Sequence, residues 1–206
     1  MGIRTLCPAT AFAALALLPP AARAQSSVSD LRVTLNTVLA EHAQLAAAAT
    51  GAALRGQTVE FQAAAAALDQ NSVSLAKAIG GVYGADAESA FLTLWRQHIG
   101  FFVDYTTAVA KKDLKGQDQA VKNLVNYATA FAAFLNRANP NLPVPVVTDL
   151  VQHHVVSLKA VVDAQAKGDW TGAFTRQREA VAHMRMIADP LAAAIGKQFP
   201  EKFAAR

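Results

Sequence analysis

Three histidines of the 206-residue sequence, His42, His98 and His154, recur at a constant interval of 56 residues. The residues around them correspond position by position without a gap, and the corresponding sets fall on the i, i+3, i+4, i+7 apolar stripe of a helix that faces a core. These sets are Val38, Leu94 and Leu150; Leu39, Trp95 and Val151; Ala46, Phe102 and Leu158; and Ala49, Tyr105 and Val161. An internal repeat of this length predicts equivalent helical units packed against one another.

A polar break follows each stripe, and a second apolar stripe follows each break. The breaks are Arg55-Gly56-Gln57, Lys111-Lys112-Asp113 and Lys167-Gly168-Asp169. Each unit then ends on residues that stop helices, which are Tyr83-Gly84, Asn139-Pro140 and Ile195-Gly196. Alanine is abundant and β-branched alternation is absent, so we predict an all-α fold. Because three units are the minimum for an open solenoid, we favour a six-helix bundle built from three antiparallel hairpins, at about 29–84, 85–140 and 141–196.

Residues 1–24 have the features of a secretory signal peptide. Arg4 supplies a basic start, the apolar stretch from Ala9 to Leu18 is too short to span a bilayer, and Ala22-Arg23-Ala24 has the A-x-A pattern of a cleavage site. We therefore expect cleavage after Ala24, export and a periplasmic location. The remainder, residues 25–206, is expected to form a single helical-bundle domain.

Composition and motifs argue against several function classes. The only cysteine, Cys7, lies in the expected signal peptide, so disulfides and thiolate ligands are not expected in the mature chain. The excess of 19 basic over 15 acidic residues is small and forms no basic stripe with interleaved aromatics, so nucleic acid is not an expected partner. No later apolar run approaches the ~20 residues of a transmembrane segment. We find no catalytic motif and favour a non-enzymatic function.

Antiparallel pairing brings residues of the second arm level with the repeat histidines. If the third hairpin turns near Gly168, His183 lies level with His154, and the equivalent positions in the other hairpins are Asn71 and Tyr127. We therefore expect one polar layer in the apolar bundle, made of His42, Asn71, His98, Tyr127, His154 and His183. Such a layer destabilises the bundle unless its members are mutually hydrogen-bonded or hold a ligand.

A transition-metal ion is the leading candidate for that ligand, because imidazole is the commonest metal ligand in proteins. We expect His98, His154 and His183 to supply imidazoles and Met186, three residues after His183 on the same helical face, to supply a thioether. Imidazole together with soft sulfur favours copper. The residues expected to support these ligands or to line a pocket beside them are His42, Tyr127, Glu179 and Trp95.

Two other interpretations of the histidines stay open. Duplication copies a core histidine without giving it a function, in which case the protein is an envelope-associated structural or protein-interaction module whose partner the sequence does not identify. Alternatively, the aromatic residues concentrated in the middle hairpin line a pocket for haem or another small apolar molecule, although the C-x-x-C-H haem-attachment motif is absent.

Four segments resemble recurring motifs of a group of exported bacterial helical-repeat proteins. They are Leu94-Trp95-Arg96-Gln97-His98, Gly168-Asp169-Trp170, the run from His183 to Asp189 and the run from Lys197 to Phe203, which fit the patterns L-W-x-x-H, G-D-W, H-M-x-M-x-A-D and K-Q-F-P-x-K-F. The resemblance implies export, helical repeats and importance of the His and His-Met positions. It implies no particular activity.

Overall fold

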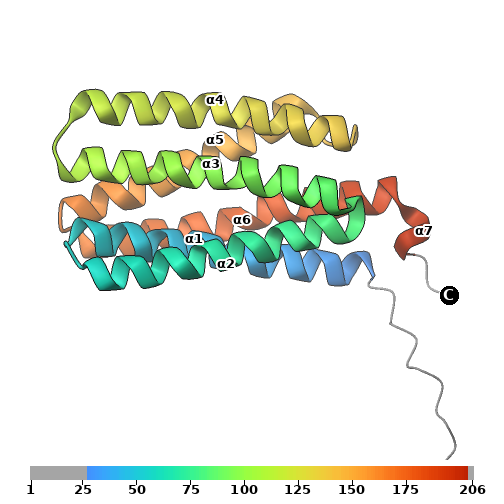
Figure 1. Ribbon diagram of the computed structural model, residues 1–206, viewed down its shortest axis with the longest axis horizontal. Helices are drawn as coiled ribbons and strands as arrows, with labels where there is room; N and C mark the ends of the chain where they lie inside the picture. The colour runs from blue at the N-terminus through green and yellow to red at the C-terminus, as the bar shows by residue number, and fades with distance from the viewer. Residues whose placement is uncertain (1–26, 204–206) are drawn as a thin grey trace, which may run out of the picture.

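The computed structural model describes residues 27–203 and contains only helices within that range (Figure 1). Six long helices are followed by one short helix: α1 (Val28–Leu54), α2 (Thr58–Tyr83), α3 (Ala85–Ala110), α4 (Leu114–Ala138), α5 (Val144–Ala166), α6 (Trp170–Gln198) and α7 (Pro200–Phe203). The expected all-α bundle is confirmed, and α7 adds one turn that begins at a proline, a residue suited to the first position of a helix. The expected signal peptide lies outside the described residues.

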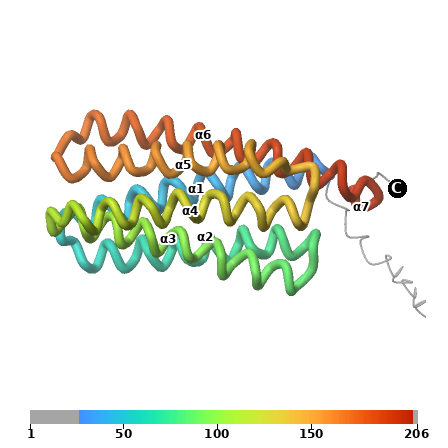
Figure 2. The backbone as a smooth tube through the Cα atoms, turned by 90° about the horizontal axis from the view of Figure 1, so that it is seen from above, coloured from blue at the N-terminus to red at the C-terminus, as the bar shows by residue number. Residues whose placement is uncertain are grey.

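The long helices alternate in direction along the long axis of the bundle (Figures 1 and 2). The turns within the pairs α1–α2, α3–α4 and α5–α6 lie together at one end, while the α2–α3 and α4–α5 connections lie at the other. Each long helix packs against its neighbours in sequence, and α6 packs back on α1, which closes a ring. In addition, α1, α3 and α5 contact one another. Of the six long helices, α1, α3 and α5 therefore meet at the centre, and α2, α4 and α6 lie outside them.

The three turns within these pairs share one backbone conformation at positions that are also 56 residues apart. Gly56, Lys112 and Gly168 have φ of 69°, 57° and 70°, which is the left-handed region. Glycine adopts this conformation without steric penalty, whereas Lys112 is the one non-glycine residue with positive φ among the described residues. A left-handed residue after the last helical turn lets the chain reverse within three residues.

Replacing Lys112 by glycine is expected to raise the free energy of unfolding by about 0.5–1 kcal/mol, since relief of the left-handed strain exceeds the entropy that glycine adds to the unfolded chain. The reverse change at an equivalent turn, Gly168→Lys, is expected to lower it by a similar amount. Urea denaturation of both variants measures the two differences. A Lys112→Gly variant that is less stable than the parent protein would contradict this account of the turns.

Hydrogen bonds between polar side chains hold the opposite end of the bundle together, where Asn139 is buried and Tyr83 and Gln198 are half-buried. The Asn139 amide donates a hydrogen bond to the Tyr83 hydroxyl at 3.1 Å, and that hydroxyl donates to Oε1 of Gln198 at 2.7 Å. These bonds join the end of α2, the α4–α5 connection and the end of α6. The connection cannot continue α4 because Pro140 and Pro143 interrupt it, and α5 begins at Val144.

The core between these two ends is built mainly from alanine, leucine, valine and aromatic side chains. Leu35, Leu75, Phe91, Tyr105 and Leu124 are among the largest side chains that are almost fully buried, and they come from the first four helices. Within residues 27–203, none of the helices combines the length and the apolar character that crossing a membrane requires.

Candidate metal centre

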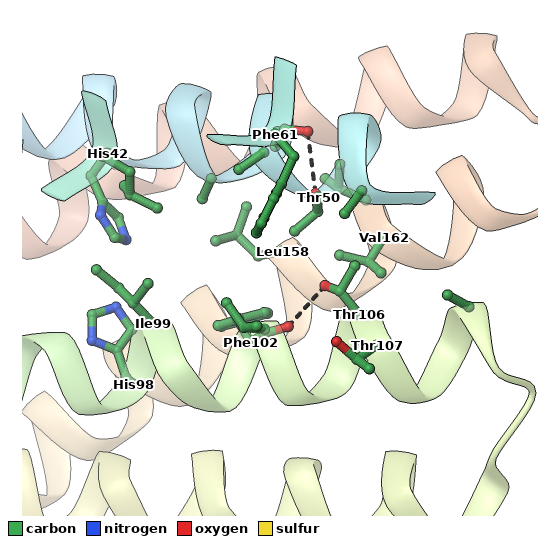
Figure 3. A pocket seen from close by; sticks show the side chains of 18 of the residues that line it. His42, Thr50, Phe61, His98, Ile99, Phe102, Thr106, Thr107, Leu158 and Val162 are labelled. Carbon is green, nitrogen blue, oxygen red and sulfur yellow. Dashed lines mark hydrogen bonds between the residues drawn. The ribbon is translucent and has the colours of Figure 1, made fainter. Parts of the chain in front are cut away.

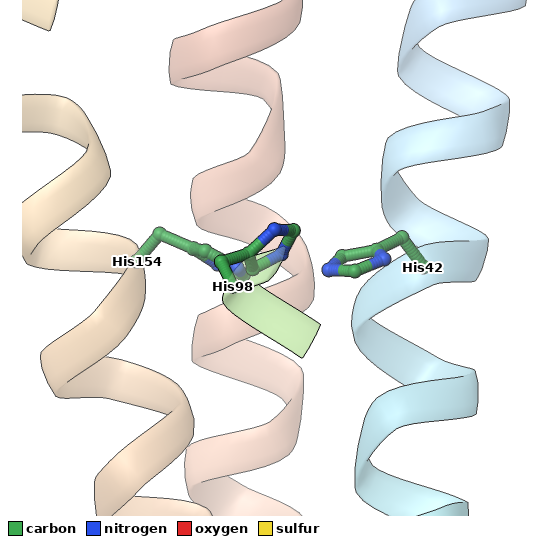
Figure 4. Close-up of side chains that lie close together, drawn as sticks. All are labelled: His42, His98 and His154. Carbon is green, nitrogen blue, oxygen red and sulfur yellow. The ribbon is translucent and has the colours of Figure 1, made fainter. Parts of the chain in front are cut away.

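The three repeat histidines converge at the centre of the bundle. His42 on α1, His98 on α3 and His154 on α5 are 1%, 3% and 4% exposed. One ring nitrogen from each lies within 4.8 Å of the others, which is a grouping that could hold a metal ion. Figure 4 shows the three imidazoles reaching into the same space from separate helices. We call this group the histidine triad.

The local sequence explains why the three rings share one height. On each helix, the histidine is the third of three buried residues at positions i, i+4 and i+7. The stripes are Leu35, Leu39 and His42 on α1; Phe91, Trp95 and His98 on α3; and Val147, Val151 and His154 on α5. Because these three helices contact one another, equivalent positions on them point to the common axis.

Hydrogen bonds beside the triad hold the three inner helices together. Thr50 on α1 donates to Oε1 of Gln165 on α5 at 2.9 Å, and the Gln165 amide donates back to the carbonyl of Ala47 at 2.9 Å. The Tyr105 hydroxyl on α3 donates to the Asp163 carboxylate on α5 at 2.6 Å. These bonds lie one to three helical turns from the histidines, so the triad sits on a fixed frame.

Four of the six imidazole nitrogens of the triad are buried without hydrogen-bond partners within the protein. Nδ1 of His42, Nδ1 of His98 and both ring nitrogens of His154 are buried and have none. The ring centroids are 5.4 Å apart for His42 and His98, 5.7 Å for His42 and His154, and 6.5 Å for His98 and His154. A buried polar atom without a partner costs about 1–3 kcal/mol, and this cluster contains at least four such atoms. The triad therefore destabilises the core, but its unpaired nitrogens are available to bind a metal ion.

Burial keeps the triad neutral at ordinary pH. Desolvation, followed by repulsion from neighbouring histidines, lowers the pKa of His98 to about 3 and that of His154 to about 3. The same causes hold the pKa of His42 well below its usual 6.5. A metal ion binds the neutral imidazole, so these rings need not lose a proton before coordination.

The neighbouring Glu41 is exposed and accepts a hydrogen bond from the Asn71 amide at 2.7 Å.

The aromatic side chains of Trp95 and Tyr127 lie against the triad. The Trp95 ring lies 4.9 Å from the His42 ring and 4.5 Å from the His98 ring, in the latter case edge-on. The Tyr127 ring stacks on His98 at 5.1 Å with 28° between the planes. The Trp95 N–H and the Tyr127 hydroxyl are also buried without a protein partner. Burial raises the pKa of Tyr127 well above 10, so its hydroxyl stays protonated.

The structure differs from the predicted site at four residues, of which His183 and Met186 were expected as ligands and His42 and Glu179 as supporting residues. His42, expected only beside the ligands, belongs to the triad. Met186 is 53% exposed and Glu179 is exposed, so both lie on the surface of α6. The physical reason is that α6 belongs to the outer ring, where its polar face meets solvent. His183 lies near enough to His154 that its charge contributes to lowering the pKa of His154, but it is not grouped with the triad.

His183 has a hydrogen bond of its own that the repeat explains. Its Nε2 lies 3.1 Å from the carbonyl of Leu150 on α5, and its ring stacks on the exposed His153 at 4.2 Å. Asn71 stands at the equivalent position of the first pair, and its amide donates to the equivalent carbonyl, that of Val38, at 2.9 Å. His183 and Asn71 therefore make the same contact between paired helices, which accounts for a histidine at this position.

We expect the variant His183→Asn to keep the stability of the parent protein, because asparagine makes this bond at position 71. His183→Ala removes the donor and is expected to lower the free energy of unfolding by about 1 kcal/mol. Thermal or urea denaturation separates the two variants. Equal losses in both would contradict a hydrogen-bonding role for His183.

A cavity of about 180 Å³ adjoins the triad between α1, α2, α3 and α5. Figure 3 shows His42 and His98 at one end of it, with Phe61, Phe102, Leu158 and Val162 among the apolar side chains along its length. Phe102 is one of the middle-hairpin aromatic residues that the sequence offers as the lining of a pocket for an apolar molecule, whereas most of the other walls consist of small or aliphatic side chains. Comparisons of the chain with protein-family models, with curated proteins and with solved structures found no match.

Proposed function

We propose that the protein is a non-enzymatic metal-binding protein that holds one transition-metal ion between His42, His98 and His154. The observation that carries this proposal is the convergence of three buried, neutral imidazoles, with nitrogens within 4.8 Å of one another and no competing hydrogen bonds at several of those nitrogens. An ion at the centre would satisfy lone pairs that nothing in the protein satisfies.

The spacing of the three nitrogens suits such an ion after a small adjustment. At metal–nitrogen distances of about 2.0–2.1 Å, ligand nitrogens around a tetrahedral or trigonal ion lie roughly 3.3–3.6 Å apart. The triad nitrogens lie within 4.8 Å, so inward movements of about an ångström complete the coordination. Rotations of the histidine side chains supply movements of that size without displacing the helices.

Copper, as copper(I), is the ion that this environment favours. Imidazole ligands suit zinc, copper, iron and nickel. The triad brings no carboxylate to balance the charge, and the cost of burying an ion rises with the square of its charge. A monovalent ion therefore fits this apolar, neutral site better than a divalent one. Because Met186 lies on the surface, the charge of the ion rather than a sulfur ligand favours copper(I) at this site.

The alternative of a purely structural module fits the triad less well. A core selected only for stability would replace the three imidazoles by apolar side chains of similar size, because the unpartnered nitrogens destabilise the fold. A haem carrier is disfavoured by size, because the cavity of about 180 Å³ is only slightly larger than one that encloses a benzene molecule, about 150 Å³.

We also propose that the chain is exported to the periplasm and belongs with the exported helical-repeat proteins it resembles. The signal-like segment at residues 1–24 and the four shared motifs support these two proposals. Export is tested by expressing the full chain in a bacterium and measuring the mass of the periplasmic product. A product that begins at Gln25 supports cleavage after Ala24, and an uncleaved cytoplasmic product opposes it.

Titration of chelator-treated protein with copper(I) tests the metal proposal. We expect one ion per chain, retained in competition with a chromogenic copper(I) chelator, and an increase in melting temperature on binding. The exposed His153 provides a matched control, because His153→Leu removes a histidine next to the triad without touching it. Failure to bind copper, zinc, nickel or iron above the level of a triad variant would exclude the proposed function.

A further inference from the structure

The cavity beside the triad is apolar along most of its length and reaches the surface. Its walls include Phe61 on α2, Phe102 on α3 and Leu158 on α5. Exposed residues of α3, Val103 and Thr107, border it, so it opens between α2 and α3. Figure 1 shows these two helices separating towards the end of the bundle that carries the α1–α2 and α3–α4 turns. A small molecule can therefore enter without unfolding the bundle.

The volume of the cavity sets the size of its ligand. A cavity of about 150 Å³ lined by leucine, isoleucine and phenylalanine binds benzene. The present cavity, about 180 Å³, has room for one six-membered ring with one or two small substituents. Its aliphatic and aromatic walls favour a hydrocarbon ring, and burial of such a ring removes apolar surface from water on both sides.

The inner end of the cavity adds one polar requirement. His42 and His98 line that end, both almost fully buried, and each has a buried Nδ1 without a protein partner. A neutral imidazole carries one donor and one acceptor nitrogen. A hydroxyl group both donates and accepts, so it satisfies either tautomer. At the histidine end a charged group on the ligand would lose its hydration without gaining an opposite charge. The charged residue of the lining, Lys111, follows the last turn of α3.

We propose that this cavity is a binding site for a neutral, single-ring hydroxylated molecule of the phenol class, with the ring against the apolar walls and the hydroxyl hydrogen-bonded to His42 or His98. The site shares His42 and His98 with the proposed metal centre, but His154 does not line the cavity and the apolar contacts need no metal, so binding at the two sites can be tested independently. It gives the protein a second ligand of a different chemical class.

Calorimetric titration of metal-free protein with 4-methylphenol tests this site. We expect one molecule to bind per chain. Toluene, which has the same ring and methyl group but no hydroxyl, is expected to bind about tenfold more weakly, because it leaves the histidine nitrogens unpaired. Absence of 4-methylphenol binding at millimolar concentration overturns the proposal, and equal binding of toluene overturns the role of the histidines.

Two variants distinguish this site from the metal site. Ala46→Leu fills the cavity and is expected to weaken 4-methylphenol binding at least tenfold while leaving copper(I) binding unchanged. His154→Leu is expected to lose copper(I) and keep 4-methylphenol. If Ala46→Leu does not fold, Ala49→Leu fills the same cavity from the next helical turn. Retention of 4-methylphenol by a folded filling variant places the ligand elsewhere and overturns the proposal, whatever the outcome for the metal.

Discussion

Replacing His154 by leucine is expected to lower the affinity for copper(I) at least about 100-fold. Removing a partner that only orients a metal ligand typically costs 10–100-fold, and loss of one ligand from a set of three costs more. Leucine has a volume close to that of histidine and makes no demand for hydrogen bonds, so the variant keeps the packing of the core. Competition with a chelator of known affinity measures the change.

The control for this prediction lies one residue away. His153 is exposed and stacks on His183 outside the triad, so His153→Leu is expected to change the affinity by less than about twofold. The leucine variants of His42 and His98 are expected to match His154→Leu, because the triad acts as one unit. A loss of affinity in His153→Leu equal to that in His154→Leu would place the metal at the surface pair and contradict the triad.

The metal-free protein is expected to lose about 4 kcal/mol of stability between pH 7 and pH 5. His98 and His154 have pKa values of about 3 in the folded protein against 6.5 in the unfolded chain. The unfolded state therefore binds protons more tightly, so stability is constant above about pH 6.5 and falls as the pH drops from there towards 3. At pH 5 each histidine accounts for about 2 kcal/mol of this loss. His42, whose pKa is lowered for the same reason, acts in the same direction.

Urea denaturation at a series of pH values measures this dependence. In the double variant His98→Leu, His154→Leu, two of the three buried histidines that must become charged on acidification are absent, so the loss between pH 7 and pH 5 is expected to shrink by about 4 kcal/mol. His153→Leu again serves as the control and is expected to keep the full loss. A double variant with the same acid sensitivity as the parent protein would show that the buried imidazoles do not govern it.

The residue pattern contained enough information to predict the class of fold. The 3.6-residue stripes and the polar breaks at 55–57, 111–113 and 167–169 predict long helices and their turns, and α1 to α6 begin or end at those breaks. Local signals are sufficient there, because turn residues act through their own backbone. Gly56 and Gly168 adopt the left-handed conformation that the turns require.

The residues that form the site were harder to predict, because they depend on which helices occupy the centre of the bundle. The sequence places His183 level with His154, and the bond from His183 to the Leu150 carbonyl, one turn away, agrees with that register. Register along a hairpin does not determine which arm faces the common axis. Because α1, α3 and α5 are the inner helices, His42 on α1 reaches the common axis, while Met186 and Glu179 on α6 face outwards.

The role of His183 is visible in the sequence when its position is compared with the equivalent position of the first hairpin. Asn71 at the equivalent position is a side-chain donor of similar reach, which indicates a hydrogen bond to the partner helix rather than a new ligand. The cavity, by contrast, arises from the divergence of α2 and α3, and no residue pattern reports the angle between two helices. Its apolar lining is indistinguishable in sequence from filled core.

Crystallography of copper-loaded protein, with anomalous diffraction recorded at the copper absorption edge, tests the central claim most directly. We predict a single strong peak between His42, His98 and His154, about 2.0–2.1 Å from one nitrogen of each ring, in a bundle whose helices have not moved. A peak beside the stacked pair His153 and His183, or no peak within the bundle of a protein that binds copper in solution, would contradict the assignment of the triad as the metal centre.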